Sequence, residues 1–271
     1  MHLPAFSIVI PAFNEEASIG SVLARVATYV EGLRSRFEVE IVAVDDGSSD
    51  GTLAVLTGFS VDNPGVLTVA FHRENAGLTA AMRTGAETAR FETVVFLDAD
   101  LSYRPEIVEP LVTARQRAGA VAALASPYMR GGRVANVPPV RLIASRGANW
   151  ILSRCAGGRL HTFTGMVRAY DRAEFLSLFD RAIEGEFNAW AAAELLRRGH
   201  RVVEIPAVLA WPPERYAAPS RLTLGKLRQR AALVVRTARV LREAVRASEA
   251  KRRAGTLVLG CQPTRPYSSD G

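Results

Sequence analysis

The stretch TVVFLDADLS at residues 93–102 places two aspartates directly after a short apolar run. The run at residues 93–97 predicts a buried strand, because it is apolar and contains β-branched side chains. Hard divalent cations bind carboxylate oxygens and share their coordination with phosphates. The pair Asp98 and Asp100 therefore indicates a site for a metal and a diphosphate. The alternative is a turn whose aspartates cap a helix that begins near Pro105.

Apolar runs of the same kind recur along the first 125 residues, and helical patterns separate them. Strands are predicted at residues 6–10, 39–44, 66–71, 93–97 and 120–125. Helices are predicted at residues 19–33, 52–59, 78–90 and 105–117. Strands that alternate with helices predict an α/β fold, with a mostly parallel central sheet and helices on both faces.

Six polar side chains fall just past the ends of these predicted strands: Asn14, Asp45, Asp46, Asn75, Asp98 and Asp100. In sheets of parallel strands, ligands bind beyond the carboxyl ends of the strands. Each loop also has a plain structural explanation, such as an Asx-turn and a helix N-cap at residues 45–48. Because three polar loops close successive strands of one sheet, a shared ligand is the better interpretation.

The second half of the chain has a looser pattern. We expect a loop between Gly131-Gly132 and Pro138-Pro139, helices at residues 141–156 and 187–198, and strands at residues 166–170 and 201–205. The expected organisation is a catalytic domain at residues 1–225, followed by a basic amphipathic helix at 226–253 and a disordered tail at 254–271. Within the domain, the change of pattern separates residues 6–125 from residues 126–225.

The net charge of +7 is concentrated in one C-terminal segment. Residues 226–253 contain ten Lys or Arg and two acids, which leaves the rest of the chain at −1. This distribution argues against a general nucleic-acid-binding surface. The same segment carries an apolar stripe flanked by arginines, formed by Leu227, Ala231, Val234, Ala238, Leu241 and Val245. Such a helix can lie on an anionic membrane, dock onto its own domain or pair with a second copy in a homodimer.

Several function classes are disfavoured by what the sequence lacks. Neither a Gly-x-Gly-x-x-Gly loop nor a Walker A motif is present, and the four histidines and two cysteines have no metal-ligand spacing. Sugar nucleotidyltransferases are one alternative enzyme class. They usually carry a glycine-rich loop after the first strand, and this chain has PAFNE there, at residues 11–15. An inactive binding module is disfavoured because Asp98 and Asp100 are both intact. Without a signal-peptide pattern or a long apolar run, a cytoplasmic location is expected, and a peripheral position on the inner face of a membrane is compatible with it.

The first half resembles family 2 glycosyltransferases of the GT-A fold. The matching stretches are IVIPAFNE at 8–15, VAVDDGSSD at 42–50, NAGLTAA at 75–81 and VFLDADLS at 95–102. The resemblance implies a nucleotide-sugar donor and a bound Mg²⁺ or Mn²⁺ held by Asp98 and Asp100. The residues implied in donor nucleotide binding are Pro11, Ala12, Asn14, Glu15, Asp46, Asn75 and Asp98.

The second half is similar to polyprenol-phosphate glycosyltransferases, of the dolichyl-phosphate mannose synthase kind. The similarity runs through SPYMRGG at 126–132, RLIASRGAN at 141–149 and the Arg168-Ala169-Tyr170 segment. It implies acceptor binding by Arg130, Arg141 and Arg168, with Arg168 also contributing to catalysis. There are departures: residues 162–168 read TFTGMVR where Asp-x-Thr-Ser-Gly-Phe-Arg is usual, Ser102 replaces a usual Gln, and Pro127 replaces a common Arg.

Together these patterns predict inverting transfer of one sugar from a nucleotide sugar to an acceptor, with a polyprenyl phosphate favoured. A phosphate acceptor is already an anion and needs cations to position it, which Arg141 and Arg168 could supply. A hydroxyl acceptor, on a glycan or small molecule, would instead need a carboxylate base. Glu184 and Glu186 are the candidates for that alternative.

Overall fold

The computed structural model describes residues 3–181, 183, 186–212 and 224–253 of the chain. The predicted tail at 254–271 and Glu184 lie outside the described residues. Strands and helices alternate along the first half, as the sequence predicts. The strands are β1 (Ala5–Ala12), β2 (Glu38–Asp45), β3 (Leu67–Phe71) and β4 (Thr93–Phe96). The helices are α1 (Ile19–Leu33), α2 (Thr52–Asp62), α3 (Leu78–Thr88), the 3-10 turn η1 (Pro105–Ile107) and α4 (Val108–Ala118).

The second half adds shorter strands and the longest helices. Its strands are β5 (Ala122–Ser126), β6 (Arg133–Ala135), β7 (Arg168–Asp171), β8 (Val202–Pro206) and β9 (Val208–Ala210). Its helices are α5 (Pro139–Cys155), α6 (Arg172–Ser177), the 3-10 turn η2 (Leu178–Asp180), α7 (Phe187–Arg197) and α9 (Leu224–Arg253).

The central sheet has seven strands in the order β3-β2-β1-β4-β7-β5-β8. All neighbouring pairs are parallel except those of β7, which runs antiparallel to both β4 and β5. The predicted mostly parallel sheet is therefore confirmed. The antiparallel β7 brings Arg168 beside Phe96, two residues before Asp98.

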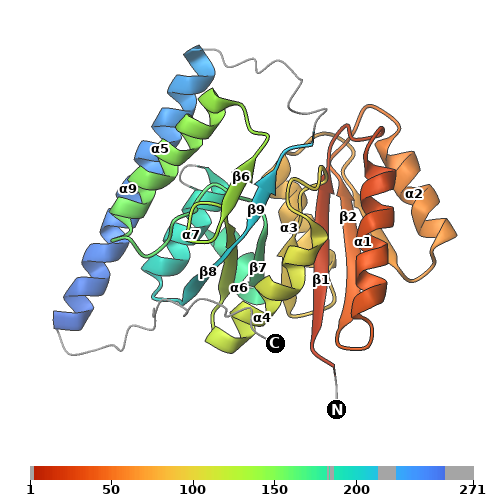
Figure 1. Cartoon of the computed structure of the whole chain (residues 1–271), viewed down its shortest axis with the longest axis horizontal. Coiled ribbons are helices and arrows are strands. Elements are labelled where there is room, and N and C mark those ends of the chain that lie inside the picture. Colours follow the sequence, from red (N-terminus) through yellow and green to blue (C-terminus); the bar gives the residue numbers. More distant parts are fainter. Residues whose placement is uncertain (1–2, 182, 184–185, 213–223, 254–271) are drawn as a thin grey trace.

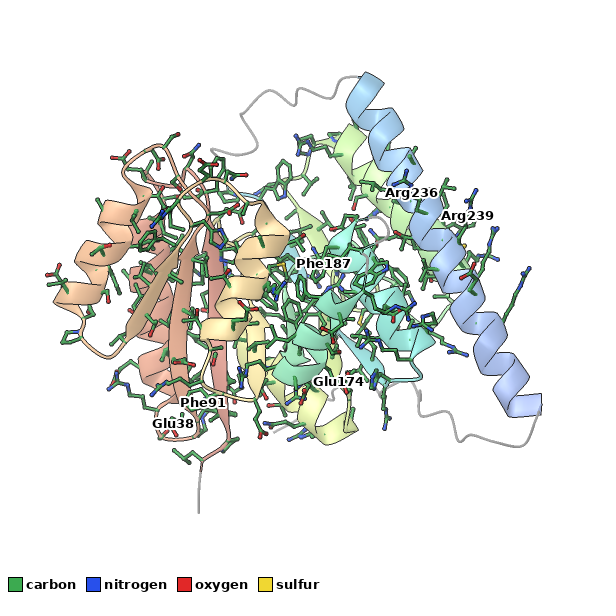
Figure 2. The ribbon with its side chains drawn as sticks, turned by 180° about the vertical axis from the view of Figure 1, so that it is seen from behind. Glu38, Phe91, Glu174, Phe187, Arg236 and Arg239 are labelled. Carbon is green, nitrogen blue, oxygen red and sulfur yellow. The ribbon has the colours of Figure 1, made fainter. Side chains whose placement is uncertain are left out.

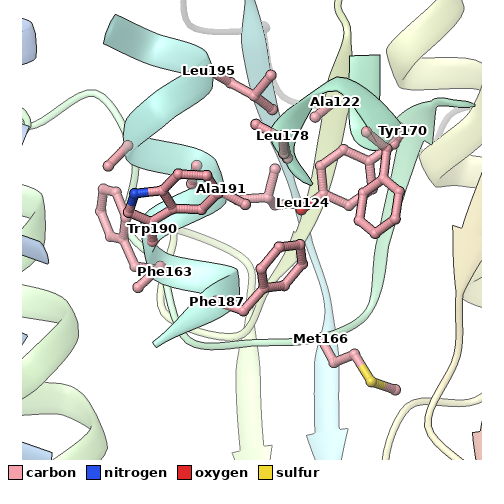
Figure 3. Close-up of a cluster of buried hydrophobic side chains, with 14 of the residues drawn as sticks. Ala122, Leu124, Phe163, Met166, Tyr170, Leu178, Phe187, Trp190, Ala191 and Leu195 are labelled. Atoms are coloured by element: carbon pink, nitrogen blue, oxygen red, sulfur yellow. The ribbon is translucent and has the colours of Figure 1, made fainter. Parts of the chain in front are cut away.

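Helices cover both faces of this sheet, and the alternation along β1 explains how (Figure 1). Phe6, Ile8 and Ile10 pack with the buried sides of α1 and α4, whereas Val9 faces the opposite core with α3 and α7. Both cores are apolar and fully buried, so the sheet is stabilised from either side. Figure 3 shows the second core, where Phe187 and Trp190 of α7 lie close to Tyr170 and Leu178.

One expectation for the second half changes, and one of its open alternatives is observed. The segment between Gly131-Gly132 and Pro138-Pro139 is not all loop, because β6 forms within it and pairs in parallel with β9. The C-terminal helix does not stand apart from the domain, since α9 packs against α7 and α5. Ala238 and Leu241 of its predicted apolar stripe are buried in that contact, while Ala231 is exposed. Of the three roles considered for this helix, docking onto its own domain is the one that the structure shows.

Candidate functional site

The loops after β1, β2 and β3 and the turn after β4 meet at one edge of the sheet, which we call the carboxyl edge. Strand register causes this, because Ala12 pairs with Asp45 and Asp45 in turn pairs with Phe71. The strands therefore end at nearly the same level. Figure 2 labels Glu38, at the start of β2, at the opposite end of these strands.

Asn14 and Glu15 tie the end of β1 to the loop after β2. Asn14 adopts a left-handed backbone conformation, with φ of 54°, and its Oδ1 accepts a hydrogen bond from the Ser49 backbone N at 2.9 Å. The backbone N of Glu15 donates to Thr52 Oγ1 at 2.8 Å. Pro11 and Ala12 are buried beneath this junction. The first residues expected to bind a nucleotide therefore lie in two loops that hydrogen bonds already hold together.

Asp46 organises the loop after β3. Its Oδ1 accepts from the Ala76 backbone N at 3.0 Å, and its Oδ2 accepts from the Gly77 backbone N at 2.9 Å and from Asn75 Nδ2 at 3.2 Å. Asp46 is 3% exposed, so this carboxylate is held almost entirely by protein donors. The structure brings Asp46 and Asn75 together as expected, and it adds that Asp46 shapes the loop itself.

Close backbone packing explains the glycine in this loop. Gly47 has φ of 67°, and a Cβ at this position would lie 2.3 Å from the carbonyl carbon of Glu74. Only glycine lets the loop after β2 approach the loop after β3 this closely. The DDGS motif therefore joins two adjacent loops of the carboxyl edge.

His72 is a member of this edge that the sequence patterns missed. Its Nδ1 lies 2.7 Å from Asp46 Oδ1, and its Nε2 lies 2.8 Å from Thr84 Oγ1 on α3. The imidazole therefore links the carboxylate of Asp46 to the helix that follows its loop. The signal was available, because His72 follows β3 directly, as the other edge residues follow their strands.

The turn after β4 draws Asp98 and Asp100 towards one residue, Ser102. The backbone N of Ser102 donates to Asp100 Oδ1 at 2.9 Å, and its Oγ donates to Asp98 Oδ2 at 3.3 Å. Leu101, between them, has φ of 49°. The helix-capping alternative is not observed, because no side chain caps η1 or α4. The result is an all-oxygen group of two carboxylates and a hydroxyl.

Tyr103 connects this turn to the second half of the chain. It is 4% exposed, and burial raises the pKa of its hydroxyl far above the ordinary value. The negative charge of Asp98 raises this pKa further, while the nearby Arg168 lowers it. The Tyr103 hydroxyl therefore stays protonated beside Asp98.

Arg168 lies in the core rather than on an acceptor-binding surface. It is 1% exposed, and its guanidinium donates to the carbonyls of Gly165 at 2.8 Å, Asn188 at 2.6 Å and Phe163. It also donates to the Tyr170 hydroxyl at 3.2 Å. These contacts use four of the five N–H donors of the guanidinium, so the side chain is held mainly by the protein itself. These contacts give Arg168 a structural role in holding the 163–165 loop, and its expected roles in catalysis and acceptor binding stay predictions.

Arg141 and Arg130 remain candidates, Arg141 as a partly buried side chain and Arg130 as an exposed one. The Arg141 guanidinium lies over the Trp211 ring, 5.1 Å from its centroid. Among the residues that the structure describes, its Nε has no hydrogen-bond acceptor. Arg130 is exposed on the segment between β5 and β6. Arg141 is thus positioned by an aromatic ring while retaining donor capacity.

Glu186 acts as the N-cap of α7. Its carboxylate accepts from the backbone N of Asn188 at 3.3 Å and of Ala189 at 3.0 Å. Burial raises the pKa of Glu186 above its ordinary value, although these hydrogen bonds and Arg168 act in the opposite direction. The cap accounts for this glutamate without a catalytic role.

A cavity of about 390 Å³ lies between α5 and the segment that follows β5. It is lined by Pro127, Tyr128, Met129, Gly132, Arg146, Asn149, Trp150, Ser153 and His161. Asn149 holds its floor together, because its Oδ1 accepts from Phe163 N at 2.6 Å and its Nδ2 donates to Thr164 Oγ1 at 3.1 Å. The cavity thus combines an arginine, aromatic rings and hydroxyl groups in the expected acceptor half.

Comparisons with known proteins identify the family of the chain and its fold. Residues 7–179 match glycosyl transferase family 2. Polyprenol monophosphomannose synthase of Mycolicibacterium smegmatis is 31% identical over 229 residues, covering 82% of this chain and 82% of that protein. Dolichol-phosphate mannosyltransferase of Pyrococcus furiosus is 31% identical over 206 residues, covering 74% of this chain and 55% of that protein.

Solved structures share the fold at lower identity. A mannosyltransferase from Pyrobaculum calidifontis, in complex with GDP-Man and Mn²⁺, superposes with a TM-score of 0.57 at 21% identity, covering 95% of this chain and 77% of that one. Glucosyl-3-phosphoglycerate synthase from Mycobacterium tuberculosis, in complex with Mg²⁺ and uridine-diphosphate, gives 0.59 at 18% identity, covering 94% and 81%. The chain therefore has the GT-A fold.

Proposed function

Because the chain belongs to glycosyl transferase family 2, we propose that it moves one sugar, with inversion, from a nucleotide-sugar donor to a polyprenyl phosphate. The observation that carries this proposal is the carboxyl edge, where the Asp98–Ser102 turn adjoins the interlocked loops of Asn14, Asp46 and Asn75.

On the donor side, the loops after β1, β2 and β3 would hold the nucleotide. Pro11, Ala12, Asn14 and Glu15 would line one wall, and Asp46 with Asn75 the other. The interlocking hydrogen bonds support this role, because a preformed pocket loses little conformational entropy when the nucleotide binds.

The turn after β4 fits a hard divalent cation. Its ligands would be the carboxylates of Asp98 and Asp100, which Ser102 draws together, and such oxygen ligands suit Mg²⁺ or Mn²⁺. Within the described residues, no group of three or more His, Cys, Asp or Glu side chains could hold a metal, so donor diphosphate oxygens would complete the coordination. When bound, the cation would neutralise charge on the departing nucleoside diphosphate.

A lipid phosphate is the acceptor that the observations favour. The names of three relatives contain polyprenol, dolichol-phosphate or undecaprenyl-phosphate. They are the two described above and, at 33% identity, an undecaprenyl-phosphate 4-deoxy-4-formamido-L-arabinose transferase of Aeromonas hydrophila. The one described carboxylate considered as a base for a hydroxyl acceptor, Glu186, is engaged as a helix cap. Arg141 and Arg130 would position the phosphate, together with Arg146, which lines the cavity.

We further propose that the enzyme works on the cytoplasmic side of a membrane, where it would meet a lipid acceptor. None of the helices in the described part of the chain is long and apolar enough to cross a bilayer. The proposed catalytic unit is residues 1–225, with its donor half at 6–125 and its acceptor half at 126–225. The basic helix that follows would then be a docked appendage of this unit.

The first experiment is a screen of nucleotide sugars for stabilisation of the protein against thermal unfolding, with and without Mn²⁺ or Mg²⁺. A ligand that binds only the folded state raises the unfolding temperature. One donor is expected to stabilise the wild type in the presence of metal, and this gain should disappear in Asp100→Asn. Absence of metal-dependent stabilisation by any nucleotide sugar would refute the donor assignment.

A further inference from the structure

Helix α5 exposes an apolar stripe to solvent. Its members are Val140, Ile143, Trp150 and Ile151, which we call the α5 stripe. Ile143 is 72% exposed and Trp150 is 61% exposed, which is unusual for large apolar side chains clustered on one helix. At 100° per residue the four positions fall within an arc of about 100° on the helix. The buried side chains of the same helix, Asn149, Leu152 and Cys155, occupy its other side.

Positive charge accompanies this stripe, and acidic residues are absent from the helix. Residues 139–155 contain Arg141, Arg146 and Arg154 and no Asp or Glu. The Arg154 guanidinium lies 5.1 Å from the centroid of the Trp150 ring. Tryptophan and arginine each combine an apolar part with a polar or charged end. Such side chains suit the boundary between the hydrocarbon and the headgroups of a bilayer.

Helix α9 extends the basic surface. It packs against α5, and both figures show the two helices side by side at the end of the molecule opposite α2 (Figures 1 and 2). Its buried face uses Ala238 and Leu241, while its exposed side carries Arg236, Arg239, Arg242 and Arg246. Together α5 and α9 contain 13 basic and two acidic residues, whereas the rest of the chain contains 21 basic and 25 acidic residues.

We propose that the α5 stripe inserts into an anionic lipid bilayer, with the outer arginines of α9 binding the headgroups beside it. This inference rests on the proposed function, since a polyprenyl phosphate lies in such a bilayer. It replaces the apolar stripe of α9 as the inserting element, because that stripe is partly buried against α5 and α7. A lipid surface fits better than a second copy of this chain, because two such basic surfaces would repel each other.

The cavity supports this placement. Trp150 belongs both to the α5 stripe and to the wall of the cavity, and Arg146 lines the cavity one helical turn earlier. Insertion of the stripe would therefore bring the cavity to the headgroup level. A lipid-linked phosphate could then reach Arg146 while its polyprenyl chain stays in the hydrocarbon.

The test is sedimentation of the full chain with phosphatidylcholine vesicles, with or without phosphatidylglycerol. Wild type is expected to bind the anionic vesicles. Ile143→Glu should weaken binding at least about tenfold, because it places a charge where the proposal inserts an apolar side chain into the bilayer. Arg239→Gln should weaken binding about fivefold. The matched control is Val61→Glu on α2, which changes an equally exposed residue, at 74%, on the far end of the molecule and should leave binding unchanged.

Two results would overturn the inference. One is equal vesicle binding by wild type and Ile143→Glu. The other is that Ile143→Glu loses self-association while its vesicle binding stays unchanged, which would make the α5 stripe a dimer interface. Sugar transfer to a short, water-soluble polyprenyl phosphate separates this inference from the proposed function. Ile143→Glu should retain that activity, whereas failure of the proposed function would leave wild type bound to vesicles but inactive with this acceptor.

Discussion

Replacing His72 with alanine should loosen the carboxyl edge, although His72 is not itself one of the residues proposed to contact the donor. The change removes one hydrogen bond to the Asp46 carboxylate, at 2.7 Å, and one to Thr84, at 2.8 Å. A hydrogen bond to a charged group is worth about 1.5–3 kcal/mol, and one to a hydroxyl about 0.5–1.5 kcal/mol. Because the His72 side chain is 18% exposed and water can enter in its place, we expect a loss near the lower end of the sum, about 2 kcal/mol.

Urea denaturation of three variants would measure this contribution. His72→Ala should lose about 2 kcal/mol, and Thr84→Val, which removes only the second contact, about 1 kcal/mol. His72→Asn places an amide N–H near the position of Nδ1 and should recover part of the loss. Asp46 also holds the backbone of Ala76 and Gly77, so His72→Ala should in addition weaken nucleotide binding. Each 1.4 kcal/mol of binding free energy lost in this way would lower the affinity about tenfold.

Two outcomes would refute this reasoning. If His72→Ala unfolds at the wild-type urea concentration, the imidazole does not stabilise the loop. If stability falls as expected but nucleotide affinity is unchanged in all three variants, His72 supports the fold without positioning the donor site.

Other substitutions separate structural from functional roles in the second half. Arg168→Ala should lower the free energy of unfolding by about 3–5 kcal/mol, because buried carbonyls lose their donor, whereas Arg141→Ala should leave the urea midpoint nearly unchanged and raise the KM for the acceptor. Equal destabilisation by both changes would contradict this division. Glu186→Gln should retain most activity, and because burial raises the pKa of Glu186, ionisation of this group opposes folding. Wild type should therefore lose stability relative to Glu186→Gln as pH rises from 4 towards 7. A free energy of unfolding that rises more for wild type than for Glu186→Gln over this range would contradict the sign.

The sequence predicts the first half of the fold well because its strands are long apolar runs that end at polar loops. The predicted helix at residues 19–33 coincides with α1, and the predicted strands lie within two residues of the observed ones. The second half is harder because β6 and β9 have three residues each and exist only through pairing with each other. The antiparallel direction of β7 likewise depends on tertiary pairing, which no local pattern encodes.

The candidate site divides in the same way. Strand ends identify Asn14, Asp46 and Asn75, because a parallel sheet brings its carboxyl ends together. Arg168 shows the limit of such reasoning, since a motif match cannot reveal that a guanidinium is buried among carbonyls. The exposure of Trp150 is also invisible in the sequence, because the spacing of apolar residues on a helix does not say which apolar face meets solvent.

The most direct test of the whole account is transfer of a labelled sugar, from the donor found by thermal stabilisation, to a short-chain polyprenyl phosphate. Wild type with Mg²⁺ or Mn²⁺ should form the sugar-phosphate product. Asp100→Ala should reduce the rate by about a thousandfold, because charge on the departing diphosphate would no longer be stabilised. The urea midpoint of this variant should stay close to that of wild type. Product formation that survives exhaustive chelation, or transfer that occurs only to hydroxyl acceptors, would contradict the account.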